Sequence, residues 1–233
     1  MITAQGIKEQ LEQYADPVKR AFLPRFFKTG KGQYGEGDRF LGVVVPHTRT
    51  VAKQYKEAPL AVVDRLLADP YHECRLCGLL ILVERYRKAS PQEQETLVDF
   101  YLAHTSRINN WDLVDLSASY ILGAYLTDKP RDVLYRLVKS DLLWEQRIAI
   151  VSTHALIRQG DPWDTLALAE QLLTTPHDLL QKATGWMLRE VGKRQKELLV
   201  QFLDRHHRTM PRTMLRYAIE KMNQEERRHY MQR

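Results

Sequence analysis

Similar helical segments recur along this chain at a nearly constant spacing, and that spacing limits the folds open to it. Arg75 and Arg147 lie in related segments 72 residues apart, and Trp111 lies halfway between them. Further steps of 35 and 30 residues lead to Lys182 and Arg212. A period of about 35 residues is typical of a helix–turn–helix unit, which can bury its apolar face only against the next unit.

Partner helices are expected between these segments. Three of the four begin with proline, which suits the first turn of a helix, and strand signals are nearly absent. The expected partner helices span residues 91–103, 130–139, 162–173 and 195–206. The sequence therefore predicts an all-α fold, a superhelical array of HEAT-like helical repeats (an α-solenoid), forming one domain over residues 1–233.

The N-terminal segment carries its own helical pattern. Apolar residues recur every three or four positions over residues 5–23, at Ile7, Leu11, Tyr14, Val18 and Phe22. This pattern predicts one amphipathic helix that ends at Pro24. We expect Phe26 and Phe27, which follow, to be buried.

A glycine-rich segment, residues 28–40, interrupts the helical pattern as an inserted loop or hairpin. It matches G-x-G-x-x-G at residues 30–35, but nucleotide binding requires a preceding strand, and here a helix precedes the motif. The acidic residues that follow would also repel a phosphate. The segment is either a protruding loop whose Lys28 and Lys31 touch a ligand or a plain surface hairpin.

Composition favours a polyanionic partner. Lys and Arg number 35 against 29 Asp and Glu, a formal net charge of +6, although a merely solvated basic surface would give the same balance. The sequence shows no secretion signal and no apolar run of about 18 residues. We expect a monomeric cytoplasmic protein without membrane contact. Cys74 and Cys77 lack a second ligand pair, which favours buried thiols over a zinc site.

The repeat also places functional residues at matching positions. Each second helix is expected to carry a basic residue, or Trp111, at the same point near its start. Equivalent positions of stacked repeats line up, which predicts a concave basic groove suited to a phosphate backbone. Cations near a helix N-terminus oppose the macrodipole, so their repetition favours ligand contact over solvation. Within the helix at 111, Trp111 and Asp115 are neighbours on one face, and Asp112 suits the first turn.

Three motifs together resemble those of the HEAT-like-repeat DNA alkylation repair family, the AlkD-type DNA glycosylases. They are Asn-Trp-Asp-Leu-Val-Asp at 110–115, Trp-Glu-Gln-Arg at 144–147 and Lys-Ala-Thr-Gly-Trp-Met-Leu-Arg-Glu at 182–190. The resemblance covers the chain from about residue 26 onward. It implies release of cationic N3- and N7-alkylated purines from DNA without a metal or cofactor, with Trp111, Asp115, Arg147 and Trp186 as the catalytic residues.

The chemistry of these residue types agrees with that implication. Asp115 would stabilise a developing sugar cation or align water, and Trp111 and Trp186 would hold a cationic nucleotide by cation–π attraction. Arg147 would bind the phosphate beside the lesion. The expected partner is double-stranded DNA, especially alkylated or distorted DNA, which implies association with the nucleoid. The expected DNA-binding residues are Lys31, Arg75, Arg147, Lys182, Arg189 and Arg212.

Two other functions fit the same sequence. Some relatives that resemble this family carry a hairpin where residues 28–40 lie and are associated with branched or distorted DNA. A non-catalytic binder of such DNA is therefore one alternative. A HEAT-type protein-interaction scaffold is the other, although the basic groove disfavours it.

Overall fold

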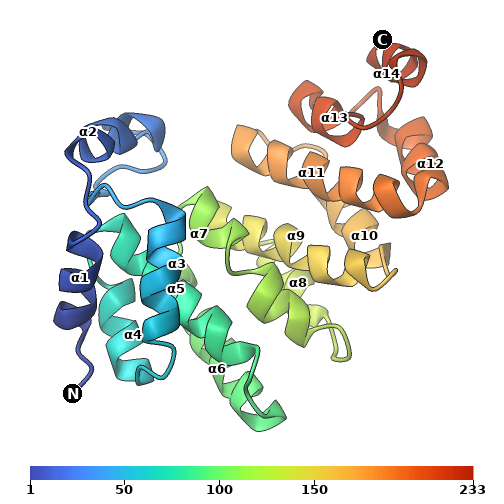
Figure 1. Cartoon of the computed structure of the whole chain (residues 1–233). Coiled ribbons are helices and arrows are strands. Elements are labelled where there is room, and N and C mark those ends of the chain that lie inside the picture. Colours follow the sequence, from blue (N-terminus) through green and yellow to red (C-terminus); the bar gives the residue numbers. More distant parts are fainter. Residues whose placement is uncertain (233) are drawn as a thin grey trace. The chain divides into compact units, whose positions relative to one another are not determined.

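The protein is built from short helices (Figure 1). The computed structural model describes residues 1–232, and within that range it contains 14 α-helices and no strand. The predicted all-α, α-solenoid fold class is confirmed. Packing divides the chain into two compact units, Met1–Ser117 and a second unit that begins at Ala118.

The first unit is built around one buried helix, α5 (His72–Tyr86). Helices α3, α4, α6 and α7 all pack against it, so α5 is buried on nearly every side and not along a single stripe. Both Cys74 and Cys77 lie on α5 as buried free thiols, as predicted. The other helices of this unit are α1 (Ala4–Glu12), α2 (Pro17–Phe26), α3 (Val45–Gln54), α4 (Leu60–Leu67), α6 (Pro91–Ala103), η1 (Thr105–Arg107) and α7 (Trp111–Asp115).

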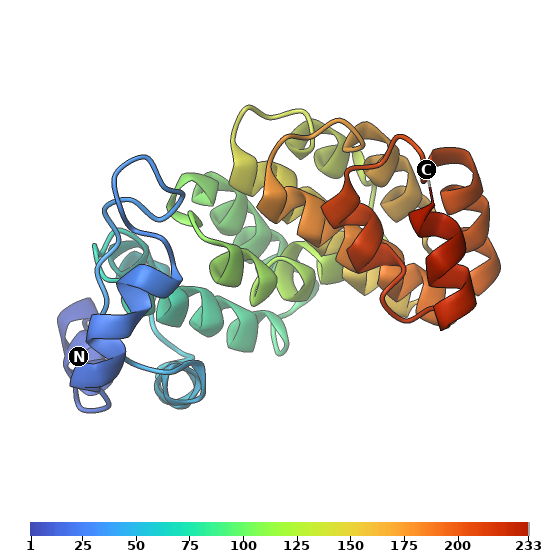
Figure 2. The same cartoon turned by 90° about the horizontal axis from the view of Figure 1, so that it is seen from above.

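The second unit repeats this arrangement around α9 (Leu143–Arg158) and α11 (Asp178–Arg194), which pack side by side (Figure 2). It opens with a π-helix, η2 (Ser119–Gly123), that packs on α9. The remaining helices are α8 (Asp132–Leu137), α10 (Trp163–Gln171), α12 (Lys196–His206), α13 (Arg212–Ala218) and α14 (Gln224–Met231). No helix among residues 1–232 has both the length and the apolar character needed to span a bilayer.

The helix boundaries agree closely with those predicted from the sequence. The residues predicted to be equivalent, however, do not all occupy the same position within their helices. Helix α6 spans the predicted residues 91–103, because Ser90 caps it and Pro91 opens it. Arg147 and Lys182 are each the fifth residue of their helices, whereas Trp111 is the first residue of α7. By this count Asp115, and not Trp111, occupies the position equivalent to Arg147 and Lys182.

The predicted N-terminal helix is wrong in three respects. It is broken into α1 and α2, because the Asp16 carboxylate caps the amides of Val18 and Lys19 and Pro17 starts a new helix. Pro24 lies inside α2 and does not end it. Phe26, expected in the core, is half exposed, while Phe27 is buried.

Residues 28–40 form an irregular loop of turns, with one isolated bridge between Arg39 and Tyr71 in place of a hairpin. The chain that follows is held by the buried carboxylate of Glu73. Its two oxygens accept hydrogen bonds from the amides of residues 41–43, at 2.9–3.1 Å. Thus α5 anchors the loop whose end reaches the candidate site.

Two glycines permit close contacts between helix backbones in the second unit. A Cβ atom at Gly185 of α11 would collide with the carbonyl oxygen of Met214 and with Tyr217 on α13. A Cβ atom at Gly123 would collide likewise with the carbonyl oxygen of Ser152 on α9. The backbones can approach this closely only without side chains there.

The substitution Gly185→Ala is expected to destabilise the protein by roughly 1–3 kcal/mol, because the methyl group forces α11 and α13 apart. Intrinsic helix propensity alone would favour alanine by about 1 kcal/mol, so the sign of the change is informative. Urea unfolding followed by circular dichroism measures it. A more stable Gly185→Ala variant would contradict the close packing.

Candidate functional site

The start of α7 presents Trp111 toward the preceding loop. The side chain of Asn110, fully buried, accepts a hydrogen bond from the Trp111 amide at 2.8 Å and so fixes the first turn. The half-buried indole stacks on Phe27, with ring centroids 5.4 Å apart and an interplanar angle of 25°. The first residue of the helix is thereby held in one orientation.

Asp112, the residue after Trp111, belongs to a buried ion cluster with Asp38, His72 and Arg75, hereafter the His72 cluster. The two ring nitrogens of His72 face two carboxylates: Nε2 lies 2.7 Å from Asp112 Oδ2, and Nδ1 lies 3.4 Å from Asp38 Oδ2. Arg75 places its Nη2 atom 2.6 Å from Asp38 Oδ1. The cluster joins three segments: the loop end, α5 and α7.

The cluster holds His72 in its charged form. Burial alone would lower the pKa of His72, but the charge and hydrogen bond of Asp112, with a further bond from Asp38, raise that pKa to about 9. Burial likewise tends to raise the pKa of Asp38, yet His72 and Arg75 bring it below its usual value. His72 is therefore protonated at neutral pH, and its two imidazole N–H groups donate to Asp112 and Asp38.

An apolar pocket of about 470 Å³, the aromatic pocket, opens beside this cluster. Trp111 and Asp115 both line it, which agrees with the predicted shared face of the helix. Phe26, Phe27 and Phe40 supply aromatic walls. The half-buried Asp115 thus belongs to the lining of an almost wholly apolar pocket.

The buried residues that hold this site in place were not predicted from the sequence. Asp112 was expected to serve the helix dipole, but it is buried against His72. His72 and Asp38 were not singled out at all. They lie 34 residues apart in the chain, and no motif or periodicity connects a loop aspartate with a histidine at the start of a helix.

The other two predicted catalytic residues belong to the second unit. Arg147 is only 5% exposed, and one guanidinium nitrogen donates to the carbonyl oxygen of Leu179. Trp186 is half-buried, donates its indole N–H to Glu190 at 3.1 Å, and lies with its ring 5.8 Å from that of His154. Convergence of these residues with Trp111 and Asp115 on one patch stays a prediction.

The predicted DNA-binding residues differ in their surroundings. Arg75 belongs to the His72 cluster, and Arg212 donates to the carbonyl oxygen of Met231 at 3.1 Å. Lys182 pairs with Asp178 at 2.6 Å, and Lys31 is exposed on the loop. The buried Arg75 therefore serves the fold, and contact of the other residues with DNA stays a prediction.

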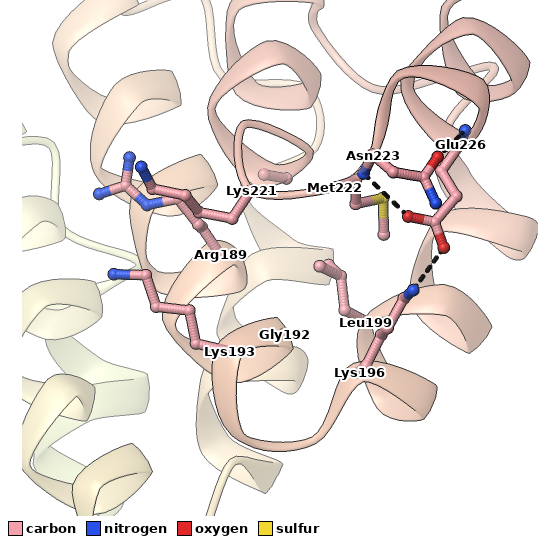
Figure 3. A pocket seen from close by; sticks show the side chains of 10 residues that line it. Arg189, Gly192, Lys193, Lys196, Leu199, Lys221, Met222, Asn223 and Glu226 are labelled. Carbon is pink, nitrogen blue, oxygen red and sulfur yellow. Dashed lines mark hydrogen bonds and ion pairs between the residues drawn. The ribbon is translucent and has the colours of Figure 1, made fainter.

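Arg189 lines a hollow of about 350 Å³ at the C-terminal end of the second unit. Figure 3 shows Arg189, Lys193 and Lys221 pointing to the same side, away from the pair formed by Lys196 and Glu226. Arg189 also pairs with Glu220. Contact of these cations with DNA phosphates stays a prediction.

The fold and the site define an α-solenoid that combines an aromatic pocket, a carboxylate and exposed cations. The family model for DNA alkylation repair enzymes matches residues 7–222, and the chain belongs to that family. It is also similar to a solved structure from Enterococcus faecalis described as a predicted DNA alkylation repair enzyme. The TM-score is 0.71 at 14% identity, over 90% of this chain and 97% of that one. At such identity the likeness shows the fold alone.

No curated protein sequence matches the chain. Membership of the family supports a role in DNA repair, with DNA as the partner.

The His72 cluster predicts that the stability of the folded protein decreases at alkaline pH. Because the pKa of folded His72, about 9, exceeds the ordinary value of 6.5, its contribution is complete below pH 6.5. That contribution is lost as the pH rises through 9. The free energy of unfolding should fall by on the order of 3 kcal/mol across this range. Urea titrations at several pH values measure it.

Two variants test the assignment. His72→Gln should remove the alkaline decline, while His206→Gln, which alters a surface histidine 3.2 Å from Glu170, should keep it. An unchanged decline in His72→Gln would show that another group is responsible.

Proposed function

We propose that this protein is a DNA glycosylase that hydrolyses the N-glycosidic bond of cationic N3- and N7-alkylated purines. The observation that carries the proposal is that the half-buried Asp115 and Trp111 both line the aromatic pocket. A carboxylate next to apolar walls is poorly hydrated, so its charge acts strongly on a nearby cation. Family membership supports the same chemistry.

The reaction needs little assistance at the leaving group. As the bond from C1′ to the purine nitrogen breaks, its electron pair neutralises the positive base, and positive charge develops on the sugar. Asp115 stabilises that charge, water adds to C1′, and the released proton passes to the carboxylate or to solvent. Trp111 offers its ring face to the cationic base, an attraction of about 0.5–2 kcal/mol.

The second candidate is a DNA binder without catalysis. The observation in its favour is the loop of residues 28–40, which exposes Lys28 and Lys31 and ends at Asp38 in the His72 cluster. Such a loop would contact DNA next to the aromatic pocket. A scaffold for proteins has no comparable support.

Asp115→Asn separates the two candidates, because it keeps the size of the side chain and deletes its charge. Single-turnover base release from DNA containing N7-methylguanine should fall by roughly tenfold to several hundredfold, corresponding to about 1.4–4 kcal/mol. Affinity for the same DNA should stay level or rise slightly.

Asp99→Asn is the matched control, since it removes an exposed charge from α6 of the same unit and should not alter release. Equal release by wild type and Asp115→Asn would exclude the carboxylate as the catalytic group. Tight binding to branched DNA by a wild type that releases nothing would favour the second candidate.

Lys182→Ala tests the predicted contact with the phosphate backbone. Loss of one phosphate contact should weaken binding to unrelated duplexes about equally and reduce the slope of log affinity against log salt by about 1. Fluorescence anisotropy at several salt concentrations measures both.

Lys129→Ala is its control, because Lys129 has similar exposure and a carboxylate partner, Asp128, but lies outside the predicted row. If both variants change the slope alike, Lys182 has no specific contact with DNA.

A further inference from the structure

Helix α2 exposes apolar side chains where a core was expected. None of its residues is buried. Val18 is 75% exposed, Phe22 54% and Phe26 50%. Their spacing of four residues places them on one face, hereafter the apolar ridge. A row of large apolar side chains in water is unfavourable, and such surfaces mark places where a partner binds.

The apolar ridge continues into the aromatic pocket. Phe22 and Phe26 have ring centroids 5.8 Å apart, and Phe26 lies 6.1 Å from Trp111 in an edge-on arrangement. Phe26 also meets Phe27, which stacks on Trp111. Four aromatic rings therefore run without a break from solvent to the first residue of α7.

Cations predominate in the chain segment that carries the ridge, although the Asp16 carboxylate caps its first turn. Between residues 17 and 35 the chain has no aspartate or glutamate and carries five exposed cations: Lys19, Arg20, Arg25, Lys28 and Lys31. A surface that binds another protein is usually depleted of charge at its centre, and lysine is rare there. Aromatic rings among cations instead match the surfaces that bind unpaired nucleotides, where bases stack on the rings and phosphates meet the cations.

We infer that the apolar ridge and the aromatic pocket bind a nucleobase displaced from the double-helical stack. Phe22 and Phe26 supply the stacking faces, and Arg25 and Lys28 meet the flanking phosphates. The pocket volume, about 470 Å³, lies within the range of roughly 300–1,000 Å³ that is usual for sites of small planar ligands. The inference rests on DNA as the partner and not on base release.

The test compares two labelled duplexes that differ only by one unpaired 2-aminopurine. Wild type should bind the bulged duplex roughly tenfold or more tightly than the paired one, as one stacked base implies. Binding should also quench the 2-aminopurine fluorescence, because an aromatic ring covers the base. Anisotropy of an end label reports affinity independently of the quenching.

Variants of the ridge identify the contact. Phe22→Ala and Phe26→Ala should lose the preference for the bulge while binding paired DNA within about twofold of wild type. Phe26→Leu should lose the quenching and Phe26→Tyr should keep it, since a purely structural apolar role would tolerate leucine. Trp163→Ala is the matched control, an aromatic residue 64% exposed on α10, and it should behave as wild type.

Several outcomes would overturn the inference. Equal affinity for bulged and paired DNA, or full preference in Phe22→Ala and Phe26→Ala, would show that the ridge does not contact a base. A wild-type dimer in sedimentation that Phe22→Ala dissociates would assign the ridge to a second copy of the chain. Binding to anionic vesicles that needs Phe22, without preference for the bulge, would assign it to a lipid surface. Loss of base release in Asp115→Asn leaves all these readouts unaffected.

Discussion

The contact between the charged imidazole of His72 and the carboxylates of Asp38 and Asp112 organises the first unit around its site. A buried ion is tolerated only when its partners surround it, and removal of one partner typically costs about 3–5 kcal/mol. Here the partners come from a loop, from α5 and from the first turn of α7. Because all three must be in place together, Trp111 and Asp115 are positioned by the same interaction that closes the fold.

This arrangement gives two neighbouring carboxylates different tasks. Asp112 is committed to His72 and is buried, whereas Asp115, one turn later at half-burial, lines the aromatic pocket. The first fixes the helix, and the second belongs to the lining of the pocket. Rigid support beneath a reactive group is what electrostatic stabilisation requires, since a group that must reorganise loses much of its effect.

The failure of the N-terminal helix prediction has a physical explanation that bears on function. The apolar spacing of Tyr14, Val18 and Phe22 is genuine, but Asp16 and Pro17 end one helix and begin another, which turns these residues outward. A local pattern of apolar residues predicts that their side chains will be covered, but it does not identify the surface that covers them. In a member of a DNA repair family, an exposed apolar ridge next to exposed cations suits DNA.

The sequence by itself determined the all-α repeat, most helix boundaries, the shared face of Trp111 and Asp115, and the resemblance that the family model bears out. These follow from helical periodicity, proline and capping signals, which act over a few residues. Only the tertiary structure decided that Arg75 serves a buried cluster, that His72 carries a charge and that Phe26 faces solvent. Burial and charge depend on residues distant in the chain, such as Asp38 and His72, and no local spacing encodes their meeting.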